Sequence, residues 1–216
     1  MKQPNVQAYI FTYKRYENLM RNVRRLKSCG IDPIVVVDEI GARIPHDQVW
    51  EHEHRGKRGF WLTWQEMLSD CKNHKADIYL FMPDDFDEFN AFKMIESHNK
   101  HKDKPYAYNI VNDGRGACWT GIEPKKVSNR DIEVGYIDCG FFCNRKALQA
   151  IKFGIQKPHE KFMNKGMSSG VGSALSQAFL KAKVKMYCPV SSYAVHGNHE
   201  SVMHPDERKD NPLKSI

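Results

Sequence analysis

The chain has 216 residues, of which 41% are hydrophobic and 11% aromatic, a composition that suits one globular domain and is too apolar for a wholly disordered chain. No run approaches eighteen consecutive apolar residues, and the amino terminus lacks the apolar stretch of a signal peptide, so we expect a soluble cytoplasmic protein without a membrane partner. The 33 basic residues exceed the 26 acidic ones by a formal charge of +7, which favours a polyanionic partner. Six dispersed cysteines without a CxxC pair indicate free thiols.

The first forty residues predict a strand, a helix and a second strand. Residues 6–12 form a short apolar run, and residues 16–29 place apolar side chains at helical spacing, with Gly30 as the expected C-cap. Residues 33–38 are β-branched and read as a buried strand. This order is typical of a βαβ unit with a parallel sheet and a right-handed crossover.

Further elements are expected along the rest of the chain. Residues 48–53 favour a third strand, residues 60–73 a helix with one apolar side, and residues 78–82 a fully buried strand. The later part is less regular, with strands expected at 106–111, 137–143 and 185–189, and helices at 145–152 and from the Gly-rich residues 168–173 to about 182.

Three carboxylates follow the buried strand at 78–82 within a few positions, namely Asp84, Asp85 and Asp87. Carboxylates this close repel one another unless a cation or hydrogen-bond donors neutralise them. Open α/β sheets bind ligands at the carboxyl ends of their strands, and hard divalent cations such as Mg²⁺ or Mn²⁺ prefer oxygen ligands. A solvated acidic turn is the alternative interpretation.

The element order and the segment Met82-Pro83-Asp84-Asp85-Phe86-Asp87 resemble the GT-A fold of nucleotide-sugar glycosyltransferases, over about the first 150 residues. The resemblance implies a mixed, mostly parallel sheet flanked by helices in one domain, with a nucleotide-binding half at 1–90, an acceptor half at 91–195 and a terminal flap at 196–216. It also implies Mn²⁺ or Mg²⁺ held by Asp85, with Asp87 as an alternative ligand and a late histidine, His196, completing the shell. Asp84 would face the ribose or the sugar.

The same resemblance implies a donor site for a nucleotide sugar, with a UDP-sugar as the first expectation. Its predicted contacts lie at the first two strand ends, before the second helix, at the Gly-rich turn and in the tail: Thr12, Tyr13, Arg15, Asp38, Arg58, Ser169, Gly170, Ser201 and Arg208. Strand-end turns, a helix cap and a charged tail explain the same residues without a ligand. The turn at 168–173 is neither a P-loop nor a complete dinucleotide fingerprint.

Asp138 is the candidate for orienting or deprotonating an acceptor hydroxyl, although a strand-initiating Asp is the alternative. The ED pair that many such enzymes use as catalytic base is not found near Gly170. The identity of the base and the choice between retention and inversion therefore stay open, as do the sugar and the oligomeric state.

Residues 168–176 and the terminal segment 196–208 also resemble the small phage-type, TET-associated glycosyltransferases that modify hydroxymethylated DNA bases. That resemblance implies a DNA acceptor, a host-cell cytoplasm and basic contacts to phosphates. The expected DNA contacts are Arg21, Arg24, Arg25, Arg55, Lys57, Lys125 and Lys126. Rival hypotheses are a polysaccharide, lipid-linked glycan or protein acceptor, a nucleotidyltransferase, and a DNA-binding module without catalysis.

Overall fold

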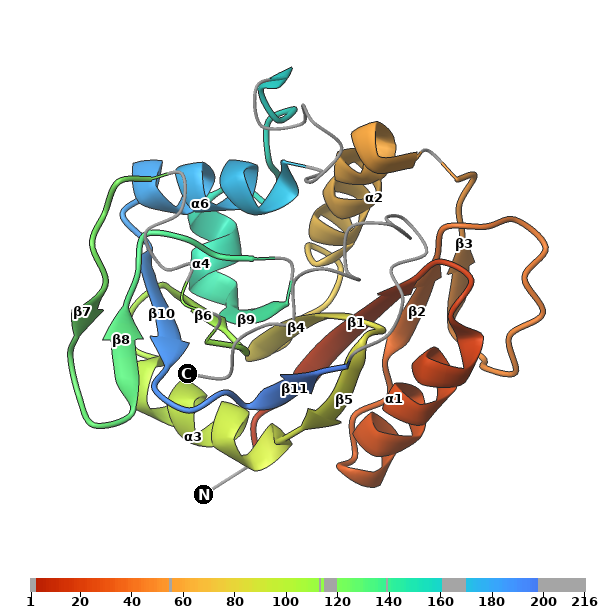
Figure 1. Ribbon diagram of the computed structural model, residues 1–216, viewed down its shortest axis with the longest axis horizontal. Helices are drawn as coiled ribbons and strands as arrows, with labels where there is room; N and C mark the ends of the chain where they lie inside the picture. Colours follow the sequence, from red (N-terminus) through yellow and green to blue (C-terminus); the bar gives the residue numbers. More distant parts are fainter. Residues whose placement is uncertain are drawn as a thin grey trace.

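A nine-stranded mixed sheet forms the centre of the computed structural model, which describes residues 3–54, 56–112, 114, 120–138, 140–160 and 170–197 (Figure 1). The strand order is β3-β2-β1-β4-β9-β6-β10-β8-β7. In chain order these strands are β1 (Val6–Thr12), β2 (Ile34–Val37), β3 (Val49–Glu51), β4 (Ile78–Pro83), β6 (Tyr106–Asn109), β7 (Lys125–Lys126), β8 (Asp131–Glu133), β9 (Phe141–Asn144) and β10 (Lys185–Pro189).

The first half of the chain forms the parallel part of the sheet. β1 lies between β2 and β4 and is parallel to both, and β3 adds a parallel strand beyond β2. All four residues of β2 are buried, as are the first five of β4, because helices cover both faces of the sheet. The expected βαβ unit is therefore confirmed.

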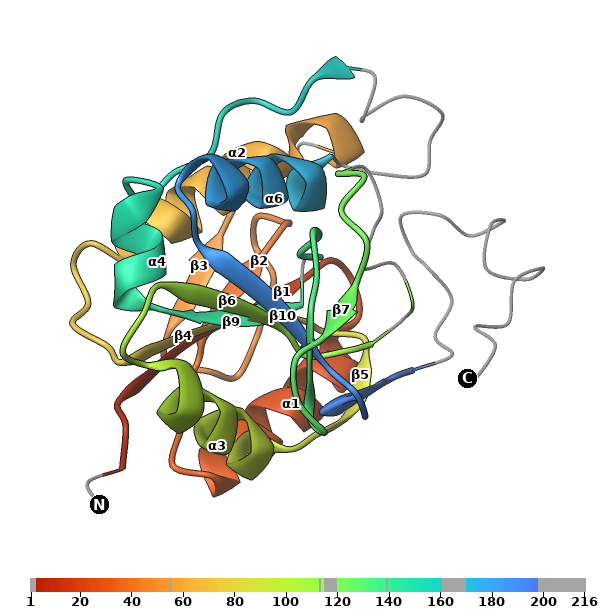
Figure 2. The same ribbon diagram turned by 90° about the vertical axis from the view of Figure 1, so that its left-hand side faces the viewer.

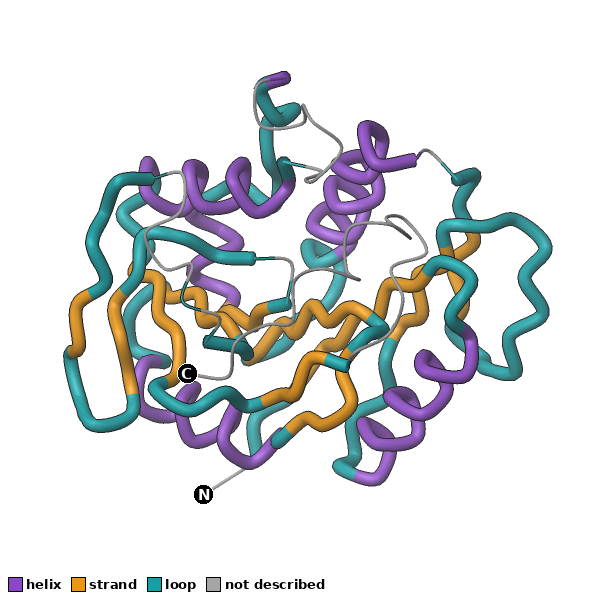
Figure 3. The backbone as a smooth tube through the Cα atoms, in the orientation of Figure 1, coloured by secondary structure: helices purple, strands orange, loops and turns teal. Residues whose placement is uncertain are grey.

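The helices of the described ranges that flank the sheet are α1 (Tyr16–Ser28), α2 (Gly56–Asp70), α3 (Ala91–His101), α4 (Arg145–Ala150) and α6 (Val171–Lys181). In Figures 1 and 3, α2, α4 and α6 lie above the sheet and α1 and α3 below it. Gly30 ends α1 as expected, with a φ of 75°. The amide of Ile31 reaches the carbonyl of Leu26 at 3.0 Å, in the bond pattern of a Schellman motif.

Each face of the sheet has its own hydrophobic core. In the core under α2 and α6, Trp64 packs against Phe81 and Phe141 with ring centroids 5.2 and 5.9 Å apart. The core on the other face joins α1 and α3 to the sheet through Leu19, Met94 and other buried side chains. Burial of such large rings contributes about 1.5–3 kcal/mol per side chain to folding.

The second half of the chain adds antiparallel pairs and one parallel pair, that of β6 with β10. β9 lies between β4 and β6 and is antiparallel to both (Figure 2). Strands that are far apart in sequence are therefore neighbours in the sheet. The strand expected at 137–143 is wrong at its start: β9 begins at Phe141. The amides of Ile137 and Asp138 are bonded to the side chains of Ser176 and Asn109 instead of to a neighbouring strand.

A separate two-stranded ribbon joins the two halves of the chain. β5 (Phe86–Phe89) follows the acidic turn directly, and β11 (Ala194–His196) returns from the end of the described chain to pair with it, antiparallel. Neither strand is expected from the sequence pattern, and neither are α3 and the hairpin of β7 and β8.

None of the helices in the described ranges is long and apolar enough to cross a membrane. Cys71, Cys143 and Cys188 are buried free thiols, and Cys29 is a half-buried one, which agrees with the expectation for these four cysteines. Cys118 and Cys139 lie outside the described residues.

Candidate functional site

Two buried carboxylates occupy the turn that follows β4. Asp84 and Asp85 are only 1% and 5% exposed. One Asp84 carboxylate oxygen accepts a hydrogen bond from the Thr12 hydroxyl at 2.5 Å, and the other lies 2.6 Å from the Arg15 guanidinium. The backbone of the turn is also fixed, because the side-chain amide of Asn22 donates to the Asp84 carbonyl at 3.0 Å. The strand ends of β1 and β4 thus meet through side chains, as parallel neighbours should.

Arg15 lies close to both carboxylates of this turn. Its guanidinium is 2.6 Å from Asp84 and 3.6 Å from Asp85. Burial raises the pKa of Asp84 to about 7; Arg15 and Thr12 counteract the shift, while the Asp85 charge adds to it. Because burial is the main cause of this shift, a positive charge brought to the carboxyl group would stabilise its ionised form.

Asp87 lies apart from this pair. It belongs to β5 and forms an ion pair with Arg21 of α1 at 2.6 Å, with both side chains more than a third exposed. Its expected role as an alternative metal ligand stays a prediction.

The ribbon of β5 and β11 brings the predicted late histidine to the acidic turn. His196 lies opposite Phe86 in the register of the two strands, and the Gly197 amide donates to the Asp85 carbonyl at 2.7 Å. The backbones of Asp85 and His196 are therefore neighbours, although the His196 side chain lies outside the described part. Among the side chains that are described, no group of three or more His, Cys, Asp or Glu residues could hold a metal ion.

A second polar cluster lies at the ends of β2 and β3. Asp38 is 5% exposed, and its Oδ2 lies 2.7 Å from Nδ1 of His54. The His54 ring stacks on Tyr13, with centroids 4.0 Å apart and planes 9° from parallel. The amide of Asp38 donates to the Thr12 carbonyl at 3.0 Å, which connects this cluster to the acidic turn.

The remaining carboxylate oxygen of Asp38 is buried and has no hydrogen-bond partner among the described residues. A buried acceptor without a donor costs about 1–3 kcal/mol, so such an atom indicates a place for a ligand's N–H or O–H group. Tyr13 and Asp38 are among the contacts expected from the sequence, whereas His54 is not. The signal that could have found it is its place one strand further along, after β3, as Asp38 follows β2.

Asp138 lies in the segment before β9, beside the end of β6. It is half-buried, and its amide donates to the Asn109 side-chain oxygen at 2.9 Å. Asn109 also binds the Tyr136 carbonyl, so it fixes the whole segment. Helix α6 packs closely here, because a Cβ on Gly172 would lie only 2.4 Å from the Tyr136 hydroxyl.

Several predicted contacts are only partly described or lie outside the described residues. Gly170 is the N-cap residue of α6 and has a φ of 72°, in the left-handed region. Lys57 and Arg58 belong to the first turn of α2, but their side chains are not described. Arg55, Ser169, Ser201 and Arg208 lie outside the described residues.

The predicted DNA contacts form two groups. Arg24 is exposed on α1, whereas Arg21 is paired with Asp87 and Arg25 donates to Asn22 at 3.1 Å. The exposed Lys125 and Lys126 form β7, at the far edge of the sheet. Six strand spacings of about 4.8 Å separate β1 from β7, so the two groups lie roughly 29 Å apart in the sheet direction.

The fold has a counterpart among solved structures. The chain is similar to the mannosyltransferase PcManGT from Pyrobaculum calidifontis, solved in complex with GDP-Man and Mn²⁺, with a TM-score of 0.60 and 11% sequence identity. The likeness covers 94% of this chain and 60% of that one, so the chain spans about three fifths of its counterpart's length. No protein-family model matches the sequence, and no curated protein matches it either. The likeness shows the fold. The expected α/β fold of the GT-A, Rossmann-like type, a mixed sheet flanked by helices, is confirmed.

Proposed function

We propose that the protein is a metal-dependent glycosyltransferase that uses a nucleotide-activated sugar. The observation that carries this proposal is the meeting of the buried Asp84–Asp85 pair with the unsatisfied Asp38 carboxylate oxygen at adjoining strand ends. In open α/β sheets this edge binds ligands. A solved structure of the same fold holds GDP-Man and Mn²⁺, which supports the same class of donor and cofactor for this chain.

The Asp38 cluster suits the base of the donor nucleotide. Its unsatisfied oxygen is an acceptor, so it suits a base that presents an N–H group on its pairing edge. Uracil and guanine present a ring N–H there, whereas adenine and cytosine present a ring-nitrogen acceptor next to an exocyclic amino group, so a carboxylate is less complementary to them. The stacked rings of Tyr13 and His54 offer a flat surface in the same cluster. We therefore expect UDP- or GDP-sugars to bind more tightly than ADP- or CDP-sugars.

The acidic turn suits the diphosphate end of the donor. Mg²⁺ and Mn²⁺ sites commonly use one or two protein carboxylates together with substrate phosphates, so the described residues fit such an ion without a three-residue cluster. Asp85 would hold the cation, and His196 is the proposed second protein ligand because its backbone lies beside the turn. When bound, the cation supplies positive charge to the departing nucleoside diphosphate. Asp84, Thr12 and Arg15 would position the turn.

Asp138 is proposed on the acceptor side, where a carboxylate can orient or deprotonate a hydroxyl group. A hydroxymethyl-pyrimidine in DNA is a second-level proposal for the acceptor, favoured by the net charge of +7 and by the exposed Arg24, Lys125 and Lys126. A glycan or protein acceptor is the alternative within the same enzyme class.

The test is a thermal-shift screen of UDP-, GDP-, ADP- and CDP-sugars with and without Mn²⁺. A donor present at a hundred times its dissociation constant stabilises the native state by about 2.7 kcal/mol, which for a chain of this size raises the melting temperature by roughly 5–10 °C. We expect this shift with a uracil or guanine donor, only when the metal is present. The Asp85→Asn variant should lose the shift. The absence of a metal-dependent shift with every donor would refute the proposal.

A further inference from the structure

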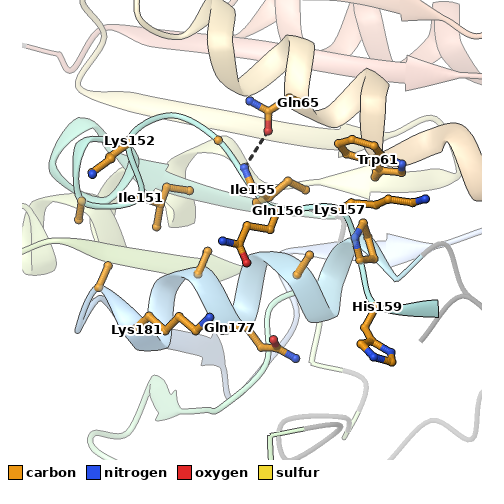
Figure 4. A pocket seen from close by; sticks show the side chains of 16 residues that line it. Trp61, Gln65, Ile151, Lys152, Ile155, Gln156, Lys157, His159, Gln177 and Lys181 are labelled. Atoms are coloured by element: carbon orange, nitrogen blue, oxygen red, sulfur yellow. Dashed lines mark hydrogen bonds between the residues drawn. The ribbon is translucent and has the colours of Figure 1, made fainter. Parts of the chain in front are cut away.

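A groove of about 730 Å³ lies between α2 and α6, on the face of the sheet that these helices cover. Residues 151–159, which follow α4, form its third wall (Figure 4). Figure 4 shows Trp61 and Gln65 of α2 on one side, Gln177 and Lys181 of α6 on the other, and Gln156 between them. This volume lies in the range of small-ligand sites, which is about 300–1,000 Å³.

The third wall is held in a strained conformation. Lys152 and Phe153 have φ angles of 57° and 54°, in the left-handed region that bulky residues rarely adopt. Gly154 then approaches Gln65 so closely that an added Cβ would lie 2.7 Å from its side-chain nitrogen. The Gln65 oxygen accepts from the Ile155 amide at 2.8 Å. Such strain persists where the surroundings enforce a particular backbone shape.

The groove is positively charged. Three exposed lysines line it, Lys152, Lys157 and Lys181, and no Asp or Glu is among its lining residues. Within the described ranges, none of these three ammonium groups is part of an ion pair. An anionic occupant therefore complements the groove electrostatically.

Its other lining groups suit a polyhydroxylated chain. The half-buried ring of Trp61 offers a flat apolar surface, and the side chains of Gln156 and Gln177 are exposed amides that can both donate and accept hydrogen bonds. Small side chains on α6, Ala174 and Ala178, leave the space open between them. A sugar ring has an apolar C–H face for stacking and hydroxyl groups around its rim, so it matches both kinds of surface.

We propose that this groove binds an acidic oligosaccharide, a short chain that includes carboxylate-bearing sugars. None of the residues of the acidic turn or of the Asp38 cluster lines this groove, and neither does Asp138. Helix α6 turns Gly172 and Ser176 towards residues 136–137, whereas Ala174, Gln177 and Lys181 line the groove. Binding here thus requires neither donor nucleotide nor metal, and it can be measured whether or not the proposed transfer reaction is correct.

The test is calorimetric titration of the full chain, without nucleotide or metal, with a galacturonate tetramer, a neutral glucose tetramer and a thymidylate tetramer. The uronate should bind at least tenfold more tightly than the neutral chain. In the double variant Lys157→Gln/Lys181→Gln, each lost charge pair should weaken uronate binding about fivefold, roughly 25-fold together, and added salt should reduce the difference. Trp61→Leu, which keeps apolar packing but removes the flat ring, should weaken both the uronate and the neutral chain.

The matched control is Lys75→Gln/Lys93→Gln, which removes two exposed lysines outside the groove and should leave binding unchanged. Equal loss in both double variants would show that only net charge matters and would overturn the proposal. Tighter binding of the thymidylate than of the uronate, reduced by the same groove variants, would assign the groove to nucleic acid instead. No binding of the uronate at millimolar concentration would also overturn it.

Discussion

We expect replacement of the buried Asp131 carboxylate to lower the free energy of unfolding substantially. Asp131 is 1% exposed at the start of β8, and its carboxylate is ion-paired with Lys100 and accepts from Ser128 and Tyr108, each at 2.7 Å. The Tyr108 hydroxyl is in turn 3.1 Å from that of Tyr193, the residue directly before β11. The carboxylate therefore supports the segment that brings β11 to the acidic turn.

The magnitude follows from the contacts that Asp131→Asn would remove. A hydrogen bond to a charged group contributes about 1.5–3 kcal/mol, and the asparagine keeps one neutral acceptor for either Ser128 or Tyr108. Lys100 is 48% exposed, so water partly replaces its partner and its share is discounted. We expect a loss of about 3 kcal/mol in the free energy of unfolding, or roughly 6–12 °C in melting temperature.

The pH dependence supplies a second readout. Burial raises the pKa of Asp131, but Lys100, Ser128 and Tyr108 stabilise the ionised form more, so its pKa lies below 3.8. The native state therefore binds this proton more weakly than the unfolded state. The difference between wild type and variant should be complete above pH 4, near the unfolded pKa, and should shrink as the pH falls through the lower native pKa.

The assay is urea unfolding followed by circular dichroism at pH 7 and in acid. The control is Glu96→Gln, which breaks an ion pair with Arg130 at 3.0 Å between two well-exposed side chains, 63% and 74%. Such a surface pair is worth at most about 1 kcal/mol. If Asp131→Asn lost no more stability than this control, or if its difference from wild type did not depend on pH, the reasoning would be refuted.

Three further predictions concern the candidate site. Asp85→Asn should lower Mn²⁺ affinity and any transfer activity by about a hundredfold or more, the loss typical of removing one electrostatic contact in an active site, whereas Asp87→Asn should change both by less than about tenfold. Equal losses of Mn²⁺ affinity in the two variants, measured by titration, would contradict the assignment. Gly172→Ala should cost about 1–3 kcal/mol, because its new methyl group would overlap the Tyr136 hydroxyl; an unchanged melting temperature would show that α6 can move away. His54→Ala should weaken donor binding roughly tenfold through the lost stacking partner and carboxylate contact, without altering metal affinity, as competition titrations with UDP and GDP can measure.

The elements with a strong local pattern were predictable from the sequence. The apolar run at 6–12, the amphipathic α1 with Gly30 at its end and the all-apolar residues 78–82 each carry a signal within their own window. Helix α3 also carried one that was overlooked, since the Asn90 side chain caps it by accepting from the Lys93 amide at 3.0 Å.

The short strands were not predictable in this way. β5 and β11 have four and three residues and pair with each other, so tertiary contact rather than local preference decides their conformation. The site shows the same division. The acidic turn after β4 was recognisable, but the inward contacts of Asp84 and the stacking of His54 on Tyr13 depend on which strand ends the fold places together.

The pairing of β5 with β11 has a consequence for the order of events during synthesis. The Asp85 carbonyl receives its partner only when Gly197 has left the ribosome, which at about 5–20 residues per second is roughly ten seconds later. Until then β5 is a strand without its neighbour, directly after the acidic turn. Unpaired strand edges are templates for association with other chains. We therefore expect the nascent protein to be most dependent on chaperones in this interval, when its parallel strands have been made and its ribbon is still open.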